Sequence, residues 1–149
     1  MGAIVKISSP VDLPPTALDV EGTRVPAVLI VDDEPIVRNM VRTSLAEKGY
    51  TVLDATGAAE ALELCKSLGD QEIDLLIVDH GLMPDKGRTV AEDILQFCPH
   101  IKVLVMSGRS YQMVHEEDGF PPGSAFLQKP FTAQQVLATV QNVLFPGMQ

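Results

Sequence analysis

Five residues with side chains suited to phosphoryl chemistry each stand at the end of a short apolar run. They are Asp32, Asp33, Asp79, Ser107 and Lys129. Carboxylate oxygens are the ligands that Mg²⁺ prefers, and a carboxylate beside the metal can act as a nucleophile. A lysine and a hydroxyl can neutralise and orient phosphoryl oxygens. If the fold brings these residues together, the set is therefore suited to accepting a phosphoryl group with the help of a divalent cation.

Asp79 is the first candidate for the nucleophile, because it ends the apolar run DLLIVD at residues 74–79. Ligands of an open α/β sheet bind at the carboxyl ends of its strands. An acid after a strand is often only a cap for the next helix, and Asp32 or Asp33 alone would be interpreted that way. Their coincidence with Asp79 favours a metal and phosphoryl site. The neighbouring His80 is interpreted as a solvated loop residue.

The elements that must position these side chains follow from alternating apolar runs and amphipathic segments. The runs predict strands at 27–31, 51–53, 74–79, 101–106 and 125–128. The segments predict helices at 35–48, 58–68, 89–97, 111–115 and 132–144. Strand and helix alternate with short connections, which indicates an α/β fold with a doubly wound five-stranded parallel sheet, helices on both faces and right-handed crossovers.

Several helix ends carry recognisable signals. Pro35 suits the first turn of a helix, where its missing N–H costs nothing, and Gly49 suits the position just after the end. Thr132 and Gln135 have the spacing of a capping box. The first helix is expected to bury one apolar stripe, made of Ile36, Val37, Met40, Val41 and Leu45.

Composition narrows the class of protein. The formal net charge of −9 argues against direct nucleic-acid binding, which needs clustered Lys and Arg. Cys65 and Cys98 have neither the spacing of a metal site nor the density of a secreted scaffold, so both are interpreted as small hydrophobes. No run is long enough for a membrane span and no signal peptide is recognisable, so membrane contact is not expected. Residues 1–26, rich in proline, are predicted to be a linker or N-terminal arm, and residues 27–149 the domain.

Four motifs in order carry a family resemblance: VLIVDDEP at 28–35, DLLIVD at 74–79, VLVMSG at 103–108 and FLQKPF at 126–131. Together they resemble a two-component response-regulator receiver domain, of the kind found alone or attached to hybrid histidine kinases. The resemblance covers about 120 residues from Ala27 onward. It implies a flavodoxin-like sheet with strand order 2-1-3-4-5. Residues 2–10 resemble, over a few positions, the closing strand of a histidine-kinase ATPase domain.

The resemblance implies roles for the residues around the acceptor. Asp79 would be the phosphoacceptor, and Asp32 and Asp33 would bind Mg²⁺ together with Asp79, with Asp33 the direct ligand. The backbone carbonyl of Gly81 would complete the metal shell. One departure affects this last assignment: the usual Met-Pro pair of the family stands here at Met83–Pro84, four and five residues after Asp79 rather than three and four.

The resemblance also implies how phosphorylation of the site would change the surface of the domain. Ser107 and Lys129 would bind phosphoryl oxygens. Pro130 resembles the family's cis-proline. Phe126 would be the switch aromatic, and its partner surface would involve the helix predicted after Tyr111.

The function implied is a phosphorelay signalling receiver that accepts a phosphoryl group from a histidine kinase or phosphotransfer protein and switches a protein-interaction surface. Such a chain would catalyse at most its own phosphorylation and dephosphorylation. It is expected to lie in the cytoplasm and to be a monomer or a weak dimer. The alternative is a receiver-like docking module that is not phosphorylated, because the altered loop after Asp79 no longer holds metal. A phosphatase of the haloacid-dehalogenase type would need a second acid two residues after the nucleophile, where Gly81 stands.

Overall fold

A computed structural model describes residues 25–68, 73–82, 87–117 and 120–147. Within these residues a single parallel sheet has the order β2-β1-β3-β4-β5, which confirms the predicted topology. Its strands are β1 (Ala27–Val31), β2 (Thr51–Ala55), β3 (Leu75–Asp79), β4 (Lys102–Ser107) and β5 (Ala125–Gln128). The strands β1 and β3 are central and almost continuously apolar, as expected for strands covered on both faces.

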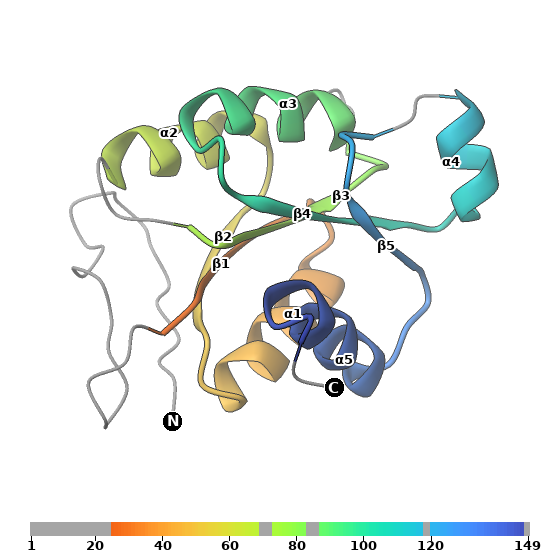
Figure 1. Ribbon diagram of the computed structural model, residues 1–149, viewed down its shortest axis with the longest axis horizontal. Coiled ribbons are helices and arrows are strands. Elements are labelled where there is room, and N and C mark those ends of the chain that lie inside the picture. Colours follow the sequence, from red (N-terminus) through yellow and green to blue (C-terminus); the bar gives the residue numbers. More distant parts are fainter. Residues whose placement is uncertain (1–24, 69–72, 83–86, 118–119, 148–149) are drawn as a thin grey trace.

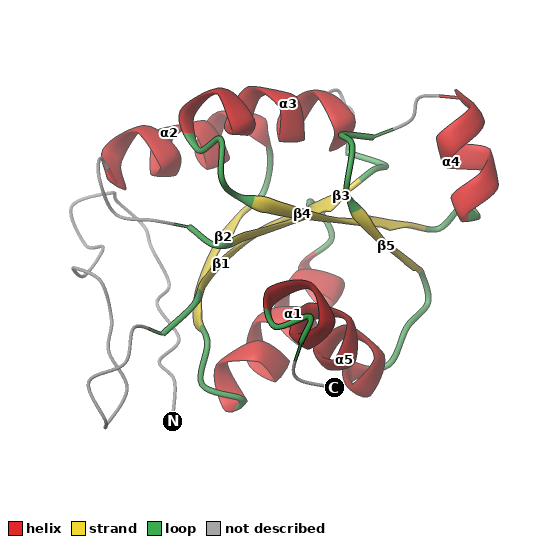
Figure 2. Cartoon of the chain, viewed as in Figure 1, coloured by secondary structure: helices red, strands yellow, loops and turns green. Residues whose placement is uncertain are grey.

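Helices follow each strand and cover both faces of the sheet. They are α1 (Pro35–Glu47), α2 (Ala58–Leu68), α3 (Gly87–Phe97), α4 (Tyr111–Glu117) and α5 (Ala133–Leu144). Figure 1 shows α2 and α3 on one face, α1 and α5 on the other, and α4 beside β5 at the end of the sheet. Among the described residues, the connections that follow β1, β2, β4 and β5, and those from α1 to β2 and α3 to β4, are short loops (Figure 2). None of the helices in the described ranges has the length and apolar character needed to cross a membrane.

The two faces have separate apolar cores because successive strand residues point to opposite sides. In β1, Leu29 and Val31 join the core beneath α2 and α3. Val28 and Ile30 join the core beneath α1 and α5. These four side chains are fully buried. The sheet is therefore held rigidly from both sides, and its carboxyl edge can present side chains in fixed positions.

The predicted end signals are confirmed. Pro35 begins α1, and Gly49 follows its end with a positive φ of 99°. Thr132 and Gln135 form the complete capping box of α5. Pro35 and Thr132 thus set where the helices after Asp33 and Lys129 begin.

Other boundaries differ from the predicted ones. The strand β2 continues to Ala55, two residues beyond its predicted end, and α3 begins at Gly87 rather than at residue 89. Ile36 was expected to face inward and is 85% exposed, so that prediction is wrong. The reason is that the inward face of α1 is set by Val37, Val41 and Leu45, and at about 100° per residue Ile36 lies outside that face.

Candidate functional site: an acidic cluster at the carboxyl edge of the sheet

Three carboxylates meet where β1 and β3 end. Val31 pairs in register with Val78, so Asp32 and Asp79 emerge side by side from neighbouring strands. Asp32, Asp33 and Asp79 each offer one carboxylate oxygen, and these oxygens lie within 4.8 Å of one another. Asp32 and Asp79 are buried, whereas Asp33 is exposed. The topology therefore brings together the acids that the sequence placed at strand ends.

Lys129 provides the cation of this cluster. Its Nζ lies 3.3 Å from Asp32 Oδ2, 3.4 Å from Asp79 Oδ2 and 2.7 Å from Glu34 Oε1. The backbone holds the residue in place, because its N–H donates to the carbonyl of Ser107 at 2.7 Å. The peptide bond from Lys129 to Pro130 is cis. The ammonium group thus bridges three carboxylates, two of which belong to the acidic cluster.

Burial and charge shift the ionisation of this cluster. Burial raises the pKa of Asp32 from 3.8 to about 6, and the Asp79 carboxylate adds to the rise, while the N–H of Glu34 and the ammonium of Lys129 oppose it. Burial by itself lowers the pKa of Lys129, but hydrogen bonding to Glu34 and the charges of Asp79 and Asp32 raise it on balance. Asp32 therefore holds a negative charge at neutral pH at a cost in folding free energy.

The segment after Asp79 keeps the Asp79 carboxylate oriented. The N–H of Gly81 donates to Asp79 Oδ1 at 3.1 Å. His80 was expected to be solvated and is only 6% exposed, so that prediction is wrong. Its N–H donates to the carbonyl of Met106 at 2.8 Å, which extends the pairing of β3 with β4 one residue past Asp79 and keeps His80 inside. The shifted Met83–Pro84 pair lies outside the described residues.

Ser107 lies further along the same edge of the sheet, at the end of β4, and Phe126 lies on the neighbouring strand β5. Ser107 ends β4 and is buried, and its hydroxyl accepts the N–H of Arg109 at 3.0 Å. Phe126, on the edge strand β5, is half-buried and meets the ring of Tyr111 edge-on at 5.6 Å. Phe120 lies 6.1 Å from Phe126, so the aromatic candidate is covered by rings from the α4 region. This arrangement agrees with the predicted neighbourhood of Phe126; its role as a switch stays a prediction.

The cluster has the composition of a site for a hard divalent cation. It offers only oxygen donors, two of them buried, and Asp32 has a raised pKa that an added cation would lower. The residues fit Mg²⁺: Asp32, Asp33 and Asp79 are the side chains that would hold it. Chemically, such a site can neutralise the oxygens of a phosphoryl group while a carboxylate attacks phosphorus.

A family model for the response regulator receiver domain matches residues 28–141. The chain belongs to this family. This receiver domain is 34% identical over 134 residues to the sensor kinase CckA of Brucella abortus, covering 86% of the chain and 13% of CckA. It is 29% identical to the chemotaxis protein CheY of Thermotoga maritima, covering 78% of the chain and 95% of CheY. The chain spans about half the length or less of several other curated relatives, among them AruR of Pseudomonas aeruginosa at 50%.

Solved structures agree with this assignment. A response regulator receiver protein from Sinorhizobium medicae is 27% identical, with a TM-score of 0.70, over 80% of this receiver domain and 94% of that chain. The response regulator TrrA of Thermotoga maritima, crystallised with Mg²⁺ and BeF, is 25% identical, with a TM-score of 0.67, over 80% and 100% of the two chains. The fold and the family predicted from the motifs are thereby confirmed.

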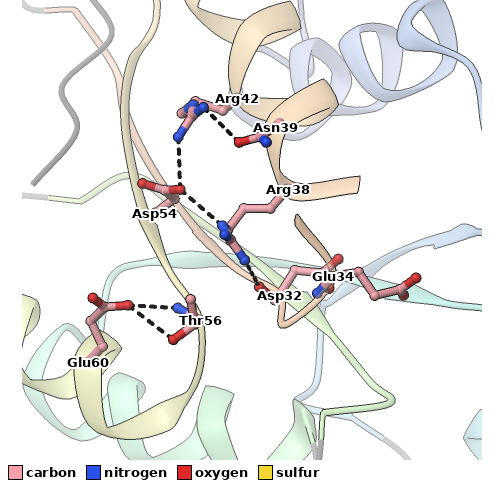
Figure 3. Close-up of polar contacts among 8 residues, drawn as sticks. All are labelled: Asp32, Glu34, Arg38, Asn39, Arg42, Asp54, Thr56 and Glu60. Carbon is pink, nitrogen blue, oxygen red and sulfur yellow. Dashed lines mark hydrogen bonds and ion pairs between the residues drawn. The ribbon is translucent and has the colours of Figure 1, made fainter. Parts of the chain in front are cut away.

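Sequence analysis missed a second group of charged residues beside the site of this receiver domain. Figure 3 shows Arg38 and Arg42 of α1 converging on Asp54 of β2, with Arg38 also reaching Asp32. The available signal was period two in β2: Val52 faces α1, so Asp54 must face it as well. Glu34 was also missed as the third partner of Lys129.

Proposed function

We propose that this receiver domain takes a phosphoryl group from a phosphohistidine onto Asp79, with Mg²⁺, and passes the change to a protein-interaction surface. The observation that carries the proposal is the meeting of three carboxylates within 4.8 Å with the ammonium of Lys129 only 3.4 Å from Asp79 Oδ2. Family membership supports it, because phosphoryl acceptance is typical of receiver domains.

The transfer exchanges one bond to phosphorus for another. A carboxylate oxygen of Asp79 forms a P–O bond while the P–N bond to the imidazole of the donor breaks, and the departing imidazole takes up a proton from solvent. Asp79 is held for attack by the strand end beneath it and by the N–H of Gly81. Lys129, with its Nζ 3.4 Å from Asp79 Oδ2, would neutralise one phosphoryl oxygen, and Ser107, which follows the register partner of Asp79 on β4, would bind another. Bound Mg²⁺ would supply further neutralisation of the charge on the transferring group.

The reporting step would use the same two residues. When Lys129 and Ser107 turn to the phosphoryl group, Lys129 leaves Glu34 and the hydroxyl of Ser107 leaves the N–H of Arg109. Ser107 ends β4 and Lys129 directly follows β5, the strand that carries Phe126 and its contact with Tyr111. The surface formed by these rings is therefore the part whose conformation we expect to change.

The donor must approach over the edge that carries Asp79. A hollow of about 340 Å³ lies beside the site, lined by Glu34, Val37, Met40, Lys129, Pro130 and Phe131. Ile36, which precedes the lining residue Val37 in the chain, is 85% exposed. A histidine kinase or phosphotransfer protein is the partner we propose, and the similarity to the sensor kinase CckA supports a partner of this class.

The docking-module alternative is not favoured. It supposes that the shifted Met83–Pro84 motif prevents metal binding, yet Asp32, Asp33 and Asp79 lie clustered, and Lys129 contacts two of them. The phosphatase alternative lacks its second acid, because Gly81 occupies that position.

The test is phosphorylation of the purified chain by acetyl phosphate with Mg²⁺, followed by intact-mass measurement and peptide mapping. We expect the mass of one phosphoryl group, located on Asp79. Asp79→Asn should remove the gain and Asp74→Asn should not, because Asp74 lies at the opposite end of β3, where its Oδ2 accepts the N–H of Ala27 at 2.8 Å. An unmodified but folded chain, or modification of Asp85 instead, would contradict the proposal.

A further inference from the structure

Arg38 connects the metal-binding turn to the neighbouring strand. It lies one turn into α1, and its side chain is 15% exposed. Its Nη1 donates to the backbone carbonyl of Asp32 at 2.8 Å, and its Nε donates to Asp54 Oδ2 at 3.1 Å. Figure 3 shows the guanidinium between these two acceptors. One side chain thus joins the first residue after β1 to the last part of β2.

The guanidinium suits this task because of its shape. It is planar, always charged, and presents several donors in a fixed fork, so two acceptors held by it are also held relative to each other. Asp54 is a firm anchor, since its side chain is 9% exposed and β2 is paired with β1 along its length. The position of the Asp32 carbonyl is therefore set from β2 through Arg38.

The carboxylate of Asp32 depends on the same turn. Its Oδ1 accepts the N–H of Glu34 at 2.8 Å, and its own N–H donates to the carbonyl of Ala55 at 3.2 Å. With Arg38 on its carbonyl, Asp32 is restrained on its N–H, its carbonyl and its side chain. A shift of the carbonyl would turn the peptide that leads to Asp33 and change where both carboxylates point.

We propose that Arg38 is a positioning residue for the metal site, which fixes Asp32 and the turn to Asp33 in the geometry that receives Mg²⁺. This inference rests on the proposed function for the identity of the metal, although the contacts that carry it are independent of that identity. Groups that orient metal ligands from outside typically change metal affinity about 10–100-fold when removed.

Arg42 offers a matched control within the same network. Its Nη1 donates to the same oxygen of Asp54 at 3.1 Å, and its side chain is 17% exposed, close to the value for Arg38. Its other hydrogen bond goes to Asn39 Oδ1 at 2.7 Å. Loss of either arginine therefore removes an ion pair with Asp54, but only Arg38 reaches the turn that carries the metal ligands.

The experiment compares Arg38→Gln, Arg38→Lys and Arg42→Gln with the parent chain. Calorimetric titration with Mg²⁺ alone measures the Kd, and thermal unfolding in EDTA measures the stability of each variant. Hydrogen exchange by NMR, also in EDTA, follows the N–H groups of Asp32 and Glu34. Arg38→Gln should raise the Mg²⁺ Kd about tenfold, whereas Arg42→Gln should leave it within about twofold at a similar loss of stability. Arg38→Lys should not restore the affinity, because one ammonium cannot hold both acceptors.

The exchange measurement keeps the inference testable apart from the proposed function. Arg38→Gln should speed exchange at Asp32 and Glu34 in metal-free protein, and Arg42→Gln should not. If the parent chain fails to bind Mg²⁺, the proposed function fails, but this exchange pattern would still support the role of Arg38. Unchanged exchange in Arg38→Gln, equal Kd values for the two glutamine variants, or full recovery with lysine would each overturn it.

Discussion

Replacing Asp32 with asparagine should stabilise the metal-free protein at neutral pH. Asp32 is fully buried, and its pKa rises from 3.8 to about 6, chiefly because burial disfavours the charged form. A tenfold change in an ionisation constant corresponds to about 1.4 kcal/mol, so the ionised carboxylate costs up to about 3 kcal/mol of folding free energy. Asparagine keeps an oxygen for the N–H of Glu34 but adds N–H donors that need partners, so the expected net gain is about 1–3 kcal/mol.

The gain should depend on pH with a definite sign. A carboxyl group whose folded pKa is raised binds more protons in the folded state between pH 4 and 6, so stability falls as pH rises through this window. The penalty is absent below about pH 4 and complete above about pH 6. Asp32→Asn lacks this titration. Its advantage over the parent should therefore be near zero at pH 4 and reach its full size at pH 7.

Urea and thermal unfolding in EDTA at both pH values test this directly. A gain of about 1–3 kcal/mol corresponds to a rise in Tm of about 3–10 °C at pH 7. Asp33→Asn is the control, because Asp33 is exposed and its replacement should change stability little. If Asp32→Asn lowers the free energy of unfolding at pH 7, or if its gain is the same at pH 4, the burial argument for this site is wrong.

Four further predictions concern the same site and the N-terminal arm. Mg²⁺ should raise the Tm at pH 7 and progressively less below about pH 6, where a proton occupies Asp32; a pH-independent rise would count against that ligand. Asp79→Asn should raise the metal-free Tm and weaken the Mg²⁺ response, because it relieves repulsion within the cluster and removes a ligand. Lys129→Ala should leave Asp79 open to phosphorylation but abolish the accompanying change in amide exchange around α4. Ser107→Ala should reduce the same exchange response less. An unchanged exchange response in Lys129→Ala would exclude the coupling through this lysine. Deleting residues 1–24 should cost less than about 1 kcal/mol of folding free energy. A loss of that size would lower the Tm by about 2–8 °C, so the observed fall should be smaller.

The parts of the fold and site that could be predicted from the sequence are those governed by strand ends. Parallel strands bring their carboxyl ends to one edge, so acids after β1 and β3 had to meet once the order of strands was known. That rule needs the apolar runs, the position of Asp79 at the end of one of them, and the strand order, which the family resemblance implied. It predicted the neighbours of Asp79 without any knowledge of side-chain rotamers.

The parts that could not be predicted depend on small offsets between elements. Because β2 was predicted to end at Leu53 rather than at Ala55, Asp54 fell outside the predicted strand, and the face of the sheet on which it lies could not be predicted. The burial of His80 required knowing that the β3–β4 pairing continues past Asp79 through the carbonyl of Met106. Ile36 seemed to belong to the apolar stripe of α1, but periodicity does not say how wide the buried face of a helix is.

In the function proposed above, the electrostatic arrangement of the site allows Lys129 both to bind a phosphoryl oxygen and to change its own contacts when Asp79 is phosphorylated. Lys129 is drawn by Glu34, Asp32 and Asp79, and the shortest of the three contacts, at 2.7 Å, is with Glu34, which is exposed. An exposed ion pair contributes little because water screens it, so this contact is the easiest to release. A phosphoryl group on Asp79 would bring more negative charge close to the ammonium than Glu34 supplies. The ammonium should therefore turn from Glu34 toward Asp79, and since the N–H of Lys129 is bound to the carbonyl of Ser107 at 2.7 Å, that turn is made at the point where β4 and β5 are joined.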